Sequence, residues 1–144
     1  MVKSARRRAR ELAVQALYQW QLAGQTIAFI EKQIVEGKEY VKADHAYFGQ
    51  LFSGTVKQSD ALKSALMPYL DRAFAELSPI ESGILLLAGY ELIHRLDIPY
   101  RVVINEAVEL AKVFGGTDGH KYVNGVLDKF AANVRSTEIN ARRV

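Results

Sequence analysis

Hydrophobic residues recur every three or four positions along most of the chain, which is the spacing of amphipathic helices. On a helical wheel of residues 5–23, one face carries Ala5, Ala9, Leu12, Ala13, Ala16, Trp20 and Ala23. Such a stripe is the face by which a helix packs on a hydrophobic core. The segment is therefore predicted to form the first helix of the fold.

The same helix carries a second apolar row on its other side. Val14, Tyr18 and Leu22 follow one another at intervals of four residues, opposite the first stripe. A helix that is apolar on two sides is either buried on both or meets a partner with one of them. The pattern by itself leaves these two alternatives open.

The rest of the chain reads as further helices separated by short turns. Periodic segments with capping residues or glycines at their ends predict helices at residues 26–36, 44–56, 59–68, 78–96, 102–114 and 119–134. No alternation typical of strands and no internal repeat is present. We therefore predict one all-α domain of six or seven helices over residues 1–144, with residues 1–4 and 136–144 frayed.

One of these segments has a strong start signal. Ser78 is a predicted N-cap, Pro79 occupies the first helical position, and Glu81 is placed to complete a capping box. The residues that follow are apolar on nearly every face of the helix. This helix is predicted to be the buried centre of the fold.

Composition restricts the class of protein. The chain has 144 residues, of which 49% are hydrophobic and 24% charged, and it has no cysteine. This is ordinary for one globular domain, and it excludes disulfides, thiolate metal sites and a cysteine nucleophile. No apolar run approaches the roughly 18 residues of a membrane span. We expect a soluble protein of the cytoplasm.

Positive charge is concentrated at the N-terminus. The first ten residues contain Lys3, Arg6, Arg7, Arg8 and Arg10 and no acid, whereas the remaining chain has 14 basic and 16 acidic residues. The arginines fall in the first turns of a predicted helix, which would present them in fixed positions. Guanidinium groups bind phosphates and stack on bases, so the pattern indicates a nucleic-acid surface. A solvated basic tail is the alternative.

Candidate catalytic patterns are weak. The histidines, His45, His94 and His120, lie on separate segments without the spacing of metal ligands. The glycine cluster at residues 115–119 follows a helix rather than a strand and lacks the spacing of a phosphate-binding loop, so it is interpreted as a turn. Glu106 and Glu109 fit a solvated helix face. We expect no enzyme, no metal and no cofactor.

Two long segments carry a family resemblance. The stretches KSARRRARELAVQALYQWQL and PYRVVINEAVELAKVFGGTDGHKYVNGVLDKF, with ELSPIESGILLLAGYEL between them, resemble the NusB family of bacterial transcription antitermination factors. The resemblance covers essentially the whole chain. It implies a helical, non-catalytic RNA-binding protein that joins the small-subunit ribosomal protein NusE. It also implies binding to the boxA sequence of ribosomal RNA leaders within the transcription elongation complex.

The resemblance also implies roles for particular residues. The RNA-binding residues would be Arg6, Arg7, Arg8 and Arg10 in the first motif and Asp118, Lys121, Tyr122 and Asn124 in the second. Tyr18 and Glu81 would meet the ribosomal protein, and we add Val14 and Leu22 from the same apolar row to this surface. Gly116 departs from the family pattern and makes the linker before the last predicted helix rich in glycine.

Other interpretations of these residues stay open at this stage. Asp118 is also placed to cap a helix or favour its N-terminus, Asn124 to tie two helices together, and Glu81 to close its capping box. A different function would be a helical adaptor or homodimer that uses the row of Val14, Tyr18 and Leu22, with the arginines serving only solubility.

Overall fold

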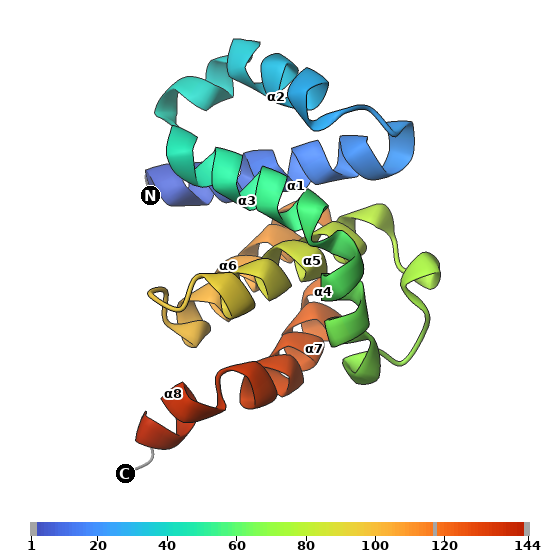
Figure 1. Ribbon diagram of the computed structural model, residues 1–144, viewed down its shortest axis with the longest axis vertical. Coiled ribbons are helices and arrows are strands. Elements are labelled where there is room, and N and C mark those ends of the chain that lie inside the picture. The colour runs from blue at the N-terminus through green and yellow to red at the C-terminus, as the bar shows by residue number, and fades with distance from the viewer. Residues whose placement is uncertain (1–2, 117, 143–144) are drawn as a thin grey trace.

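The fold is built from α-helices in two groups. The computed structural model describes residues 3–116 and 118–142. In these ranges the helices are α1 (Ala5–Ala23), α2 (Ile27–Glu36), α3 (His45–Lys57), α4 (Ser59–Leu66), α5 (Pro79–His94), α6 (Tyr100–Phe114), α7 (Gly119–Val134) and α8 (Ser136–Arg142). Figure 1 shows α1, α2 and α3 above the group of α5, α6 and α7. The predicted all-α class is confirmed, and α8 is the helix that the sequence did not predict.

Short 3₁₀ turns link several of these helices. They are η1 (Lys38–Lys42), η2 (Met67–Tyr69) and η3 (Phe74–Glu76). Pro68 lies within η2, where the predicted helix was expected to break. Within the described ranges, no helix is long and apolar enough to span a membrane.

Local side-chain caps set where the helices begin. The hydroxyl of Thr26 accepts a hydrogen bond from the Phe29 amide at 3.2 Å, and that of Ser78 accepts one from the Glu81 amide at 3.1 Å. Each cap satisfies one of the amides that a helix start leaves without a partner. Gly24, with φ of 65°, ends α1 in the left-handed region that glycine adopts without strain.

The predicted central helix is confirmed as α5. Every residue from Ser82 to Leu92 is buried, and α1, α3, α4, α6 and α7 all pack against this helix. Gly54 allows α3 to approach closely, because a Cβ atom there would stand 2.5 Å from the Tyr90 ring. A helix that is apolar all round is stable only when it is enclosed in this way.

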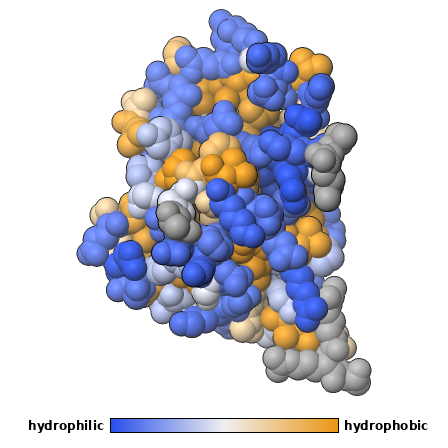
Figure 2. Space-filling view, turned by 180° about the vertical axis from the view of Figure 1, so that it is seen from behind, coloured by the Kyte–Doolittle hydropathy of each residue, from blue (hydrophilic) through white to orange (hydrophobic). Residues whose placement is uncertain are grey.

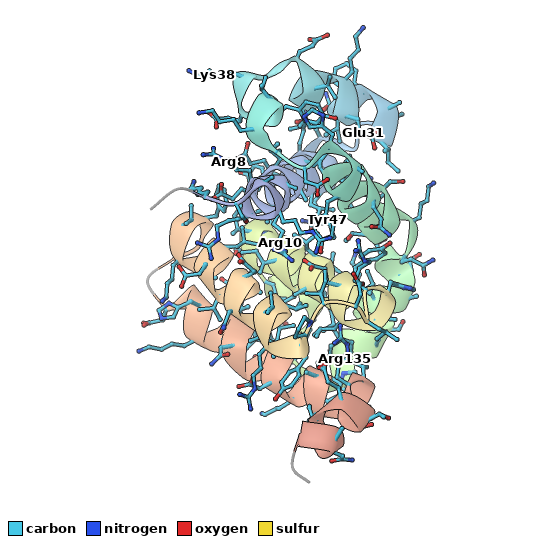
Figure 3. All side chains as sticks on the ribbon, turned by 90° about the vertical axis from the view of Figure 1, so that its left-hand side faces the viewer. Arg8, Arg10, Glu31, Lys38, Tyr47 and Arg135 are labelled. Carbon is cyan, nitrogen blue, oxygen red and sulfur yellow. The ribbon has the colours of Figure 1, made fainter. Side chains whose placement is uncertain are left out.

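A buried ion pair joins α1 to α5. The guanidinium of Arg10 donates two hydrogen bonds of 2.9 Å to the Glu91 carboxylate, and the Tyr47 hydroxyl donates a third at 2.6 Å. Arg10 and Tyr47 lie together between α1 and α5 in Figure 3. Burial favours a lower pKa for Arg10, but the hydrogen bonds and charge of Glu91 outweigh it and raise the pKa. Arg10 therefore stays charged inside the protein.

A second buried arginine orders the C-terminal segment. The Arg135 guanidinium donates to the carbonyls of Leu92 and Ile98 at 2.7 and 2.9 Å and to the Glu138 carboxylate at 3.1 Å. These bonds hold the start of α8 against the end of α5, and residues 136–142, for which fraying is predicted, are described as a helix. Residues 143–144 lie outside the described residues.

Side-chain bonds also hold the residues before α1. Ser4, predicted to fray, accepts a hydrogen bond from the Arg7 amide at 3.0 Å and so caps α1. Lys3 forms a 3.0 Å ion pair with Glu11. Both residues therefore belong to the ordered start of the helix. Residues 1–2 lie outside the described residues.

Replacing Arg10 by alanine is expected to destabilise the protein strongly. The variant leaves the Glu91 carboxylate buried without its cation, and breaking such a pair costs about 3–5 kcal/mol. Urea denaturation of the native protein and the variant measures this difference in the free energy of unfolding. Arg8→Ala is the matched control at a partly exposed position, with an expected change of about 0.5 kcal/mol. Equal losses in the two variants would contradict the structural role of Arg10.

Candidate nucleic-acid interface

The basic residues at the start of α1 do not have equal access to a ligand. Lys3 is paired with Glu11, and Arg7 donates to both oxygens of the Glu106 carboxylate at 3.0 and 3.2 Å. The hydrogen bond to Glu106 raises the pKa of Arg7. Arg10 is only 3% exposed, so the prediction that it lies on an RNA-binding surface is corrected: its guanidinium faces Glu91 in the core.

Arg6 and Arg8 remain available at the surface. The Arg6 side chain is exposed and forms no ion pair with a described residue. Its guanidinium carbon lies 4.6 Å from the centroid of the Tyr47 ring, a cation–π contact, and its charge helps to lower the pKa of the exposed Asp97 carboxylate. Arg8 is partly exposed and makes no hydrogen bond or ion pair with another described residue. It lies away from Arg10 and Tyr47 in Figure 3. The two arginines flank the first turn of α1 on different sides.

The second predicted RNA-facing element is the start of α7. Lys121 and Asp118 form an exposed pair with 3.5 Å between Nζ and Oδ1. Asp118 stands at the N-cap position, but its side chain makes no capping hydrogen bond. Asn124 is exposed and has no hydrogen bond with another described residue, so it does not tie two helices together. All three polar groups therefore face solvent.

Tyr122 is less open than the sequence suggested. It is partly buried, and the guanidinium carbon of Arg72 lies 4.7 Å from its ring centroid. Arg72 is itself held by Asp71 at 2.8 Å. Burial raises the pKa of the Tyr122 phenol, and the Asp71 carboxylate adds to the rise. Sequence reasoning missed Asp71 and Arg72, because they lie in a connecting segment without a motif.

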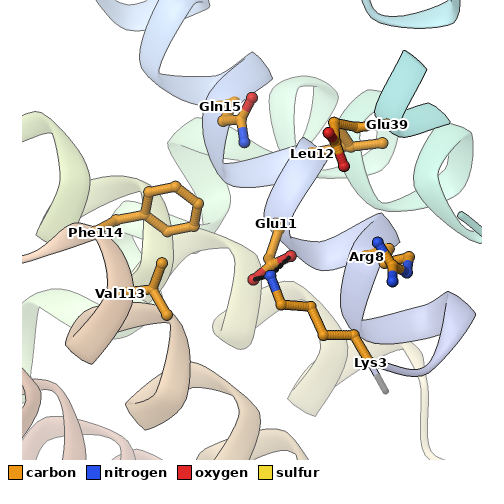
Figure 4. A pocket seen from close by; sticks show the side chains of 8 residues that line it. All are labelled: Lys3, Arg8, Glu11, Leu12, Gln15, Glu39, Val113 and Phe114. Carbon is orange, nitrogen blue, oxygen red and sulfur yellow. Dashed lines mark hydrogen bonds and ion pairs between the residues drawn. The ribbon is translucent and has the colours of Figure 1, made fainter. Parts of the chain in front are cut away.

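The first motif packs against α6. The end of α6 is followed in the chain by the second RNA-facing element. The ion pair between Arg7 and Glu106 connects α1 to α6. A pocket of about 410 Å³ lies between the α1 residues Arg8 and Gln15 and the α6 residue Phe114. Figure 4 shows Phe114 reaching toward α1 across this space. Basic side chains of α1 thus lie close to the turn that leads into α7.

The predicted partner-binding row on α1 is interrupted. Tyr18 and Leu22 are 41% and 58% exposed, but Val14 is 1% exposed and belongs to the core. The reason is that α1 packs against α3 as well as α5, so more than half of its circumference is covered. The outward face of α1 instead carries Gln15 together with Tyr18 and Leu22, and Val14 is removed from the surface set.

A groove of about 430 Å³ lies beside Leu22. Phe74, Leu77 and Pro79 contribute to its walls. Gln21 fixes one side of it, because its amide donates to the Pro79 carbonyl at 3.1 Å and accepts from the Ser82 hydroxyl at 2.6 Å. The exposed end of α1 and the start of α5 therefore form one concave surface.

Glu81 lies next to this surface and also next to α7. Its carboxylate accepts a hydrogen bond from the Ser78 hydroxyl at 3.2 Å, and among the described residues it accepts none from the Ser78 amide, so the Ser78 half of the predicted capping box is formed and the Glu81 half is not. A Cβ atom at Gly119 would lie 3.8 Å from Cγ of Glu81. Glu81 thus stands between the groove beside Leu22 and the exposed start of α7.

The hydrophobic surface is divided into patches. On the face shown in Figure 2, orange patches are separated by hydrophilic side chains, and the larger ones lie in the upper half of the view. The described residues contain no group of three or more His, Cys, Asp or Glu side chains that could hold a metal ion.

Comparisons with known proteins all point to one family. The NusB family model matches residues 7–132. The transcription antitermination protein NusB of Ralstonia pickettii (strain 12J) is 55% identical over 141 residues, covering 98% of this chain and 91% of that protein. The structure of T. maritima NusB has a TM-score of 0.80 at 28% identity and covers 92% of this chain and 94% of its own.

A further solved structure contains ligands. It describes the antitermination factors NusB and NusE in complex with double-stranded RNA. The similar chain has a TM-score of 0.77 at 27% identity, with coverage of 88% of this chain and 95% of that chain.

Aspartate substitutions one helical turn apart on α1 should separate buried from exposed positions. Val14→Asp places a carboxylate in the core, where an unpaired charge costs several kcal/mol, and we expect loss of the cooperative unfolding transition. Tyr18→Asp changes an exposed site, and we expect a shift of only about 0.5 kcal/mol. Thermal unfolding followed by circular dichroism measures both. Similar melting curves for the two variants would show that the placement of Val14 is wrong.

Proposed function

This chain belongs to the NusB family and is a transcription antitermination factor, not an enzyme, and we propose that it binds boxA-type single-stranded RNA together with NusE. The RNA would be the leader of a ribosomal RNA transcript, bound in the cytoplasm as it leaves the elongating polymerase. The pair would then act within the transcription elongation complex.

The observation that carries the RNA-binding part is that Arg6 and Arg8, unlike Arg7 and Arg10, form no ion pair with a described residue. Glu106 already occupies Nε and Nη2 of Arg7, whereas no carboxylate of a described residue accepts a hydrogen bond from Arg6 or Arg8, so all five donors of each stay available to a phosphate. The Ser4 cap holds them on an ordered helix, so little conformational entropy is lost on binding. Cations presented in this way supply the salt-dependent contacts to a nucleic-acid backbone.

The other predicted RNA residues then have different roles. We assign Arg7 to positioning, because its bonds to Glu106 connect α1 to α6. Lys121 would add a phosphate contact, and Asn124 an amide that can both donate and accept at a base edge. Arg10 is left out of the RNA-binding set because it is buried.

We assign the partner surface to Tyr18, Leu22 and Glu81. A related NusB was crystallised with NusE and double-stranded RNA, which supports a ternary complex of the two proteins with RNA for this family. Exposed aromatic and aliphatic side chains beside a concave groove are typical of protein interfaces. Because Glu81 also adjoins the start of α7, a partner seated here would extend the RNA-binding surface. Linked binding of this kind raises the affinity for RNA.

Removing Arg6 and Arg8 is expected to weaken RNA binding and its salt dependence. In Arg6→Ala/Arg8→Ala, the slope of log affinity against log salt concentration should fall by roughly 0.7 for each lost phosphate contact. Fluorescence anisotropy with a boxA-type oligonucleotide at several salt concentrations measures it. Lys32→Ala/Lys57→Ala removes the same charge from exposed positions on α2 and α3 and should keep the native slope. If both double variants behave alike, only net charge matters and the surface is misassigned.

Tyr18→Asp is expected to weaken the complex with NusE. An interface aromatic at the centre of a contact typically contributes about 2 kcal/mol or more, so the dissociation constant should rise by at least about 30-fold. Titration calorimetry with purified NusE measures it. Phe29→Asp, at an exposed aromatic position on α2, is the control and should bind NusE normally.

Two results would contradict the partner surface. Normal binding of NusE by Tyr18→Asp would remove Tyr18 from the interface. A native protein that sediments as a dimer, and becomes a monomer in Tyr18→Asp, would assign this face to self-association.

A further inference from the structure

We propose that the pocket between α1 and the end of α6 binds one nucleobase turned out of the RNA strand, and that it prefers a base with an exocyclic amino group. The proposal rests on the RNA-binding function proposed above and names the ligand of one part of that surface. It concerns the pocket of about 410 Å³ that contains Phe114 and Gln15.

The shape of the pocket suits a flat aromatic ligand. Its volume lies within the range of about 300–1,000 Å³ that is typical of small-molecule sites. The partly exposed Phe114 ring and the exposed Val113 form the wall that α6 contributes (Figure 4). Phe114 makes no ring contact with another described aromatic side chain. Single-stranded RNA offers unstacked bases, and these stack on such rings.

The charges around the pocket orient a nucleotide. Arg8, which has no ion pair with a described residue, supplies a cation for a phosphate. Glu39 and Gln15 place oxygen acceptors in the lining, and Glu11 is already neutralised by Lys3 at 3.0 Å. A carboxylate repels a phosphate but accepts hydrogen bonds from an amino group on a base. The phosphate would therefore lie toward Arg8 and the base edge toward Glu39 and Gln15.

These acceptors discriminate between bases. Adenine, cytosine and guanine each carry an exocyclic amino group that can donate to the Glu39 carboxylate, whereas uracil carries only carbonyls at the equivalent positions. Uracil offers a carboxylate only its N3–H, which is flanked by two carbonyl oxygens that the carboxylate repels. The arrangement therefore favours an amino-bearing base at one position of the bound RNA.

A double-mutant cycle between protein and RNA tests the stacking contact. Phe114→Leu keeps an apolar side chain but removes the aromatic ring, and affinity for a single-stranded boxA-type oligonucleotide should fall by about 5- to 150-fold. Abasic sites are introduced one at a time along the same RNA. At one position, the abasic site should lower the RNA affinity of the native protein by a similar factor. The same abasic site should lower the affinity of Phe114→Leu almost no further.

Two further variants protect the test against misfolding. Gln15→Ala lies at an exposed position and should show coupling to the same nucleotide even if Phe114→Leu is unstable. Phe29→Leu makes the same chemical change at an exposed site on α2 and should bind RNA like the native protein. The salt slope of Phe114→Leu should equal the native slope, because stacking releases no counterions.

Base identity is tested at the coupled position. Replacing cytidine by uridine there, or adenosine by inosine, should weaken binding to the native protein. In Glu39→Gln this difference should shrink, because the amide can also donate to a carbonyl.

The outcomes separate this proposal from the proposed function. If the native protein shows no binding to the oligonucleotide that depends on Arg6 and Arg8, the RNA-binding function itself is wrong, and this proposal fails with it. If that binding is present but no position couples to Phe114→Leu or Gln15→Ala, the RNA-binding function stands and the base pocket is overturned. If one RNA position couples to Phe114→Leu but shows no preference for a base with an amino group, the role assigned to Glu39 is overturned, and the stacking of a base on Phe114 stands.

Discussion

The buried ion pair between Arg10 and Glu91 fixes how α1 sits in the molecule. Two charges removed from water are tolerated only when they meet in good geometry and their remaining hydrogen-bonding groups are satisfied. Here the guanidinium meets the carboxylate with two bonds of 2.9 Å, and the Tyr47 hydroxyl completes the network. Rotation of α1 by even one residue would separate these groups. The pair therefore determines which side chains of α1 reach the solvent.

This constraint divides the basic residues of the first motif by role. Arg10 stabilises the core, and Arg7 connects α1 to α6 through Glu106, while Arg6 and Arg8 lie at the surface without an ion pair to a described residue. The arginines of the first motif look equivalent in the sequence, but two of them stabilise the structure and two are available to a ligand. The division explains how a strongly basic segment can be ordered, since its inner members are paired with acids.

The same placement of α1 makes the proposed surfaces continuous. Its outward face passes from Arg8 through Gln15 beside the pocket to Tyr18 and Leu22 beside the groove. Glu81 lies where that groove approaches the start of α7. RNA bound at one end and a protein bound at the other would therefore be neighbours. Such an arrangement allows each ligand to raise the affinity for the other through direct contact or a shared surface.

Local chemistry made much of the fold predictable from the sequence alone. Helix periodicity, the caps at Thr26 and Ser78 and the wholly apolar α5 depend on near neighbours in the chain, and all were confirmed. The family resemblance came from long contiguous motifs, and the match to the NusB family confirmed it.

Tertiary structure alone decided which residues of those motifs are available. A helical wheel gives the direction of a side chain but not how much of the helix its neighbours cover, and α3 and α5 together bury Val14 and Arg10. Arg72 over Tyr122, Arg135 ordering α8, and Phe114 facing α1 all join residues far apart in the chain. Such contacts leave no periodic signal, because they depend on how whole helices pack rather than on the sequence around each residue.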